Sequence, residues 1–178
     1  MHTANPTLDL TPIGMIFQLI KTAEETEGRT LEMEWTLQPR TGGAPVHLHP
    51  GASEAWLVLE GRLDVQVNGR WRTLHAGELL TIPPGTPHTF RNPHHGLTRV
   101  YNTHAPALRY QAYFEGLARI VQHLSGGRPA PLARNWKTAT YLSMHLHRFR
   151  PEIVSVRPSP VLVALLSRVG RWSGCGVE

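Results

Sequence analysis

The chain has 178 residues, of which 40% are hydrophobic, and this size and content suit one folded core and exclude a large multidomain assembly. The net charge of +5 is distributed unevenly, because residues 1–104 hold 8 basic and 10 acidic side chains whereas residues 105–178 hold 10 and 3. A single cysteine, Cys175, excludes a disulfide within the chain, and no apolar run reaches the roughly 20 residues of a membrane-spanning helix, so we expect a soluble cytoplasmic protein.

Short strands separated by Gly and Pro are predicted between residues 13 and 103, which indicates an all-β sandwich or barrel. The clearest strand covers residues 31–38, where apolar and polar side chains alternate and Trp35 lies on the apolar face. Asn68-Gly69 favours a two-residue hairpin turn, because both residues tolerate a positive φ. Further strands are expected at residues 56–59, 63–67, 71–74, 79–82, 88–91 and 97–103. In this order the strands predict an antiparallel meander.

The spacing of apolar residues becomes helical after Pro106. A first helix is expected to run from about residue 108 to the Gly126-Gly127 pair, and a second from residue 135 to 149, before Pro151. A third is expected from Pro160 to Trp172, ending at Gly174. The sequence therefore predicts a barrel over residues 1–104 and a helical C-terminal appendage over residues 105–178, packed on or beside the barrel.

Two histidines, His47 and His49, stand two residues apart in an extended stretch, so on a strand their side chains project to the same face. Glu54 follows the Pro50-Gly51 turn and can return beside them. Two imidazoles and a carboxylate are a common ligand set for Fe, Mn, Ni or Zn. In a chain with 11 histidines such a pair is also often a surface feature, so the pair alone leaves both interpretations open.

A second pattern lies in the stretch GELLTIPPGTPHTFRN at residues 77–92. Together, the two stretches resemble the paired motifs of the cupin superfamily, as found in small bacterial single-barrel cupins. The matching positions are His47-x-His49-x4-Glu54-x6-Gly61 and Gly77-x5-Pro83-x-Gly85-x2-His88-x3-Asn92. The glycine expected before the first motif is Gly42, one residue closer than usual. The resemblance covers about residues 30–103 and implies a mainly β fold, a single double-stranded β-helix of jelly-roll type.

The resemblance also implies that His47, His49, Glu54 and His88 hold one divalent metal ion, which can be Fe, Mn, Ni or Zn. Four protein ligands leave two positions of an octahedral ion for water, dioxygen or a bidentate substrate. This implies a metal-dependent enzyme, a dioxygenase for a small enediol, diketone or phenolic substrate, with Glu54 able to act as a base. The same family also includes isomerases and cyclases, and a non-catalytic module that binds or senses a small ligand is a further alternative.

Four strand aromatics, Trp35, Trp56, Phe90 and Tyr101, are candidates to line the mouth of the barrel and stack on a planar substrate. Aromatic residues of strands more often belong to the core, so both roles stay open. His145 and His147 also form a His-x-His pair, but residues two apart on a helix do not face each other, and we expect no shared site there.

A small-molecule substrate is the expected partner. Nucleic acid is not expected, because the basic residues of the appendage form no dense run and prolines break its helices into short pieces. The last helix carries Arg168 and Arg171 beside apolar residues and resembles a helix that lies on an anionic membrane surface, but we expect it instead to cover the barrel or a dimer interface. The resemblance implies a homodimer formed through the strand at residues 15–21.

Overall fold

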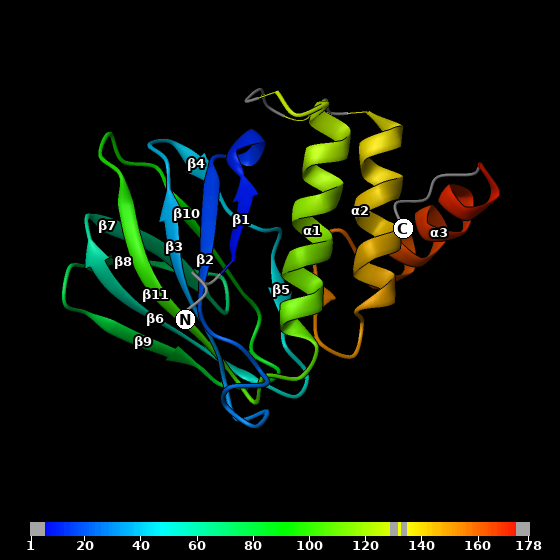
Figure 1. The fold of residues 1–178 in the computed structure, drawn as a ribbon. Coiled ribbons are helices and arrows are strands. Elements are labelled where there is room, and N and C mark those ends of the chain that lie inside the picture. The colour runs from blue at the N-terminus through cyan, green and yellow to red at the C-terminus, as the bar shows by residue number, and fades with distance from the viewer. Residues whose placement is uncertain (1–5, 129–131, 133–134, 174–178) are drawn as a thin grey trace.

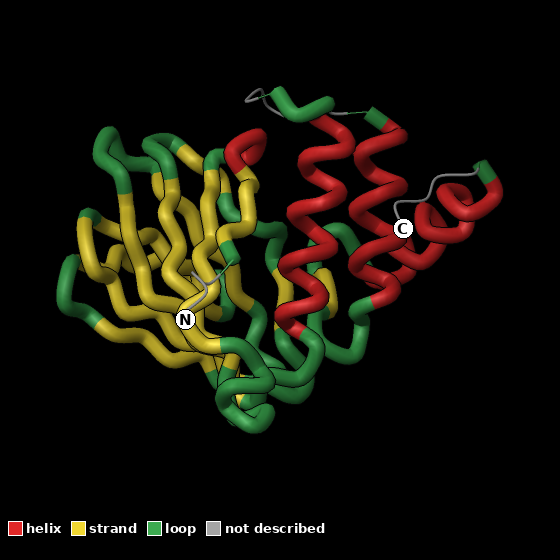
Figure 2. The backbone as a smooth tube through the Cα atoms, viewed as in Figure 1, coloured by secondary structure: helices red, strands yellow, loops and turns green. Residues whose placement is uncertain are grey.

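The computed structural model describes residues 6–128, 132 and 135–173, and it has the jelly-roll fold that the sequence predicts. Two sheets face each other, and the helices lie together on one side of them (Figures 1 and 2). One sheet has the order β1 (Thr7–Leu10), β2 (Met15–Lys21), β3 (Leu31–Leu37), β11 (Thr98–Ala105), β6 (Ser53–Glu60) and β9 (Leu79–Ile82). The other has the order β12 (Val154–Ser155), β5 (His47–Leu48), β10 (His88–Asn92), β7 (Arg62–Val67) and β8 (Arg70–His75), with β4 (Thr41–Gly42) beside β10.

The strands are antiparallel wherever they pair in the described residues, but the predicted meander is wrong. Successive strands such as β6 and β7, or β9 and β10, belong to different sheets. Each sheet buries one apolar face, and crossing between the sheets lets both faces close on the same core. The local pattern sets where strands occur, whereas the pairing depends on contacts between distant segments.

The alternation predicted for β3 is confirmed, because Leu31, Met33, Trp35 and Leu37 are all buried. The hairpin is confirmed as well: Asn68 and Gly69 have φ values of 50° and 81° and connect β7 to β8. The inward faces of the two sheets therefore form one apolar core around the positions of the two sequence motifs.

The three helices have nearly the predicted bounds: α1 (Tyr110–Ser125), α2 (Trp136–Arg148) and α3 (Pro160–Trp172). The Asn135 side chain accepts a hydrogen bond from the N–H of Thr138 and caps α2. Gly126, with φ 63°, ends α1. The predicted stop at Gly174 lies outside the described residues. α1 lies between the sheets and α2, and α3 packs on the far side of α2 (Figure 1).

The segment that follows α2 contributes a strand to the second sheet. In β12, Val154 pairs with Leu48 and Ser155 pairs with His47. The backbone after the helices thus forms the edge of the sheet beside the first motif. Within the described residues, none of the helices has both the length and the hydropathy needed to cross a bilayer.

α1 and α2 meet at a close contact between a glycine and a histidine. The Nε2–H of buried His145 donates to the Tyr113 carbonyl (2.9 Å), and the two rings stack with centroids 4.9 Å apart. A Cβ atom at Gly116 would lie 2.6 Å from Cε1 of His145. His147, two residues further along, is half-buried, whereas His145 is buried against Tyr113, so the two histidines of this pair have different surroundings.

We therefore expect Gly116→Ala to destabilise the protein. Overpacking costs roughly 1–3 kcal/mol and the better helix propensity of alanine returns about 1 kcal/mol, so the free energy of unfolding should fall by up to roughly 2 kcal/mol. Urea unfolding followed by circular dichroism measures it. In a His145→Ala background the same change should be neutral or stabilising, because the ring is gone. A stabilising effect of Gly116→Ala in the parent chain would contradict this packing.

Candidate metal centre

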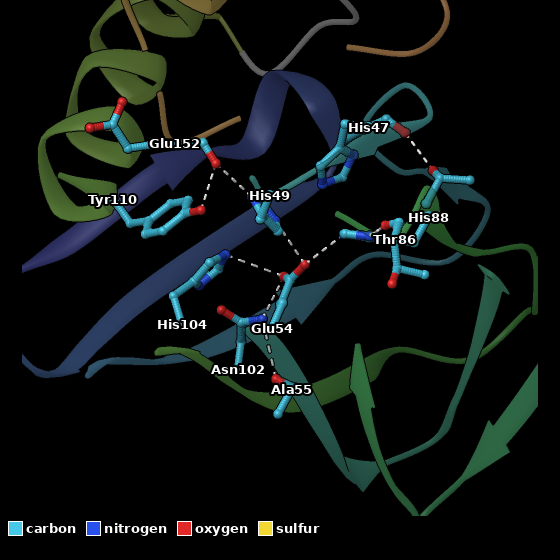
Figure 3. Close-up of polar contacts among 12 residues, drawn as sticks. His47, His49, Glu54, Ala55, Thr86, His88, Asn102, His104, Tyr110 and Glu152 are labelled. Carbon is cyan, nitrogen blue, oxygen red and sulfur yellow. Dashed lines mark hydrogen bonds and ion pairs between the residues drawn. The ribbon is translucent and has the colours of Figure 1, made fainter. Parts of the chain in front are cut away.

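Four residues of the two motifs converge in the interior of the sandwich (Figure 3). One potential ligand atom from each of His47, His49, Glu54 and His88 lies within 4.8 Å of the others, and all four residues are buried. His47 is on β5, His49 follows it directly, Glu54 is on β6 and His88 begins β10. The cluster is thus built from both sheets.

Strand pairing fixes the backbone positions of the cluster. His88 is the register partner of His47 across β10 and β5, and on the facing sheet Glu54 is paired with Ile82 and with His104. The N–H of Gly85 donates to the His49 carbonyl (2.8 Å), which ties the loop before His88 to the end of β5. Gly85 has φ 74°, a conformation that favours glycine.

Each of the three histidines is oriented by a backbone carbonyl. Nδ1 of His47 lies 2.8 Å from the Pro45 oxygen, and Nδ1 of His88 lies 2.7 Å from the Thr86 oxygen. Nδ1 of His49 lies 3.0 Å from the Glu152 oxygen. A carbonyl oxygen only accepts, so each Nδ1 carries the proton and, in a neutral ring, each Nε2 presents a lone pair. Metal-ligating histidines are usually oriented in this way.

The lone pairs of His49 and His88 face a carboxylate. Oε2 of Glu54 lies 3.2 Å from Nε2 of His49 and 3.0 Å from Nε2 of His88 (Figure 3). In neutral rings this arrangement brings electron pairs against a negative charge, and it is favourable only when protons or a cation lie between them. The donor set of imidazole nitrogens and one carboxylate oxygen fits a divalent metal ion.

Burial dominates the electrostatics of the cluster. Burial disfavours the charged imidazole and lowers the pKa of His47 and of His104 to about 3. Burial acts in the opposite direction on Glu54, but the interactions with His104, His49 and His88 outweigh it and hold the pKa of this carboxyl well below its usual range. Burial also lowers the pKa of His88, but the hydrogen bond with Glu54 outweighs it and raises that pKa. Glu54 is therefore a carboxylate at neutral pH.

A further set of residues, which the sequence patterns did not identify, supports the cluster from behind. The side-chain amide of Asn102 donates to Oε1 of Glu54 (2.8 Å). The hydroxyl of Tyr110, at the start of α1, donates to the Glu152 carbonyl (2.6 Å), the same oxygen that accepts from His49. His104 lies 3.5 Å from Glu54, measured between Nε2 and Oε1. The C-terminal segment therefore orients one of the candidate ligands.

A cavity of about 380 Å³ lies beside the cluster. His47, His49, Glu54 and His104 form part of its wall. Most of the remaining wall is apolar and comes from the barrel and from the helices. This volume is within the range of pockets that hold a small molecule.

The four aromatic candidates have different outcomes. Trp35 and Phe90 line the cavity. Trp56 is fully buried and packs between His88 and Phe90, so it belongs to the core. The prediction for Tyr101 is wrong: it lies on the outer face of β11, where its hydroxyl donates to Glu32. On β11 the inward residues are Thr98, Val100, Asn102 and His104. Apolar Val100 alternates with charged Arg99, and this alternation predicts that Tyr101, two residues after Arg99, faces outward.

Comparison with known proteins identifies the barrel. The family model described as the cupin domain matches residues 33–104, which include all four residues of the cluster. Residues 33–104 are a cupin domain. The family match ends before α1, so the helices of this cupin lie outside it.

Two curated relatives are similar to parts of this cupin. Quercetin 2,3-dioxygenase of Bacillus subtilis is 39% identical over 51 residues, which cover 29% of this chain and 15% of that protein. The HTH-type transcriptional regulator PuuR of Escherichia coli is 38% identical over 79 residues, which cover 44% of this chain and 42% of the regulator. The chain thus spans less than half the length of the curated relatives it matches.

Solved structures show the same fold. An RmlC-like cupin from Shewanella frigidimarina has a TM-score of 0.53 at 22% identity, over 62% of this chain and 92% of that chain. KdgF from Halomonas sp. has a TM-score of 0.53 at 15% identity, over 62% of this chain and 94% of that chain. At these identities the likeness concerns the fold alone.

We expect Asn102→Leu to weaken metal binding, because Glu54 loses the amide that fixes Oε1. Loss of such a supporting contact typically lowers metal affinity about 10–100-fold. Competition for Zn²⁺ with a chromophoric chelator measures the affinity. The matched control is Thr103→Leu, which places the same side chain on the outer face of the same strand. Equal affinities of the two variants would argue against a supporting role for Asn102.

Proposed function

We propose that this cupin is a divalent-metal-dependent enzyme of the dioxygenase type that acts on a small chelating molecule. The observation that carries the proposal is the convergence of three carbonyl-oriented imidazoles and one buried carboxylate beside an internal cavity, which His47, His49 and Glu54 line. A structural metal needs no adjoining cavity, whereas a catalytic metal needs open positions that a substrate can reach.

His47, His49, Glu54 and His88 would hold the metal, and the mixture of nitrogen and oxygen donors suits Fe, Mn, Ni or Zn. A bound metal would supply coordination positions for two oxygen atoms of an enediol, diketone or phenol and, when it is redox-active, electron transfer to dioxygen. The three Nδ1–H···O=C contacts fix the rings before any ligand binds, so the site is preorganised.

Glu54 is the candidate general base. It is a carboxylate at neutral pH, it borders the cavity, and Asn102 holds Oε1 in place. A hydroxyl of a bound enediol or phenol could transfer its proton to this carboxylate within the cavity, where burial excludes competing water. The similarity of 51 residues to quercetin 2,3-dioxygenase supports the oxygenase chemistry.

A non-catalytic sensing module is the second candidate, and the similarity of 79 residues to the regulator PuuR favours it. In that case the cavity would bind a ligand without turnover. Detection of a reaction product separates the two candidates. The native metal separates an oxygenase from an isomerase or cyclase, because zinc does not cycle between redox states.

His49→Ala and His88→Ala should each lose the metal. Each substitution removes a ligand and one of the contacts of the buried carboxylate, so affinity should fall by more than the roughly 100-fold upper value for a supporting residue. Elemental analysis of anaerobically purified protein gives the metal content, and dioxygen uptake with catechol gives the activity. His147→Ala, on α2 but outside the cluster and the wall of its cavity, is the control and should leave both unchanged.

Two outcomes would count against the proposal. If the histidine variants retain the metal content of the parent chain, the cluster is not the metal site. If the parent chain contains only zinc and consumes no dioxygen with catechol or with enediol substrates, the dioxygenase reaction is excluded in favour of isomerase, cyclase or sensing roles.

The small-molecule partner, the cytoplasmic location, the homodimer and the absence of nucleic-acid or membrane binding stay predictions. The structure adds one constraint on the dimer. β2, the strand expected to form the interface, is paired with β1 on one edge and with β3 on the other. A dimer that adds a strand at this end of the sheet would therefore have to use β1, the edge strand beside β2.

A further inference from the structure

The cavity beside the metal cluster is enclosed by the C-terminal helices as well as by the barrel. Aromatic residues Phe17, Trp35 and Phe90 line it from the sheets, and Phe114, Leu117 and Leu142 line it from α1 and α2. A molecule that reaches the cluster must therefore also contact the helices. The helices determine which molecules fit, although they lie outside the part of the chain that matches the cupin family.

The wall of this cavity disfavours anionic molecules. Within its described lining there is neither an arginine nor a lysine, and the one carboxylate is Glu54. A carboxylate or phosphate would lose its hydration without gaining a cationic side chain, and Glu54 would repel it. The large hydrocarbon surface favours an uncharged, mainly apolar molecule.

His104 supplies a polar contact in this apolar wall. It is 1% exposed, it lines the cavity, and neither of its ring nitrogens has a hydrogen-bond partner among the described residues. The ring packs beside Tyr110 and Phe114, with centroid distances of 4.3 Å and 5.4 Å. Nε2 lies 3.5 Å from Oε1 of Glu54, beyond a good hydrogen bond, and Nδ1 has no polar contact in the described part of the chain, so this imidazole is suited to a hydroxyl group, which can accept from one nitrogen or donate to the other.

We infer that the cavity binds an uncharged phenol, with its aromatic part between the barrel aromatics and α1–α2 and its hydroxyl group at His104. This inference narrows the substrate class of the proposed enzyme and in that sense rests on the proposed function. Binding of the ligand, however, depends on the apolar wall and on His104, so it does not require the metal.

Three probes of similar shape test the inference: 2-naphthol, 2-naphthoate and naphthalene. Binding to the 178-residue chain is measured by calorimetry or by tryptophan fluorescence, both before and after removal of metal. In the metal-free chain 2-naphthol should bind about tenfold or more tightly than either other probe, because one good hydrogen bond corresponds to about that factor and the anion has no counter-charge.

Two variants locate the binding site. Leu142→Trp fills the cavity from α2 and should weaken 2-naphthol about tenfold or more, whereas Lys137→Trp, exposed on the same helix, should have no effect. His104→Phe keeps an aromatic ring and removes both nitrogens, so the preference for 2-naphthol over naphthalene should disappear. Circular dichroism checks the folding of each variant, and Ala139→Leu, a smaller change in the same wall, replaces Leu142→Trp if that chain does not fold.

The inference is overturned if 2-naphthoate binds the metal-free chain as tightly as 2-naphthol, or if folded Leu142→Trp or its replacement binds 2-naphthol like the parent chain. It is also overturned if His104→Phe retains the preference for 2-naphthol over naphthalene. These results are separable from the metal proposal. A chain that binds metal through His49 and His88 but rejects 2-naphthol refutes only the ligand class, whereas a chain that binds 2-naphthol and no metal refutes only the metal centre.

Discussion

The arrangement of the interior depends on one electrostatic constraint: a buried carboxylate faces the Nε2 atoms of two imidazoles. The Nδ1 atoms of the same rings already donate to backbone carbonyls. Glu54 is buried away from bulk solvent, and His49 and His88 direct Nε2 toward its oxygen. The local structure therefore has to supply positive charge at this point. The sheets supply the rigid frame, because His47 and His88 are register partners and Glu54 stands on the facing sheet.

The C-terminal segment takes part in this frame through its backbone. The Glu152 carbonyl accepts from both His49 and Tyr110, and β12 follows two residues later and pairs with the strand that carries His47. The helices also complete the cavity wall. The orientation of a candidate ligand and the shape of the cavity thus depend on residues that lie outside the cupin match.

Much of the fold and of the candidate site was predictable from the sequence because both are encoded locally. Alternation, turn residues and helix caps located β3, the Asn68-Gly69 hairpin and α1 to α3, and two spaced motifs located the four clustered residues. The strand order was not predictable, because it depends on which distant faces bury one another. From the sequence, Tyr101 is among the candidates for the barrel mouth, but on β11 it faces outward. Because neighbouring residues of a strand face opposite sides, the inward polar side chains of β11 near the cluster are those of Asn102 and His104. The role of Glu152 left no side-chain signal, since its main-chain oxygen makes the contact.

The shared Glu152 oxygen has a thermodynamic consequence. His49 is held in the orientation that a metal would require only while the backbone around residue 152 is docked against the barrel. The affinity for a cation and the free energy of docking the helices are then thermodynamically linked. Docking of the helices raises the cation affinity, and a bound cation stabilises the docked helices by the same coupling free energy. Sequence changes at the far surface of the helical layer can in this way tune occupancy at the centre of the barrel without touching any ligand.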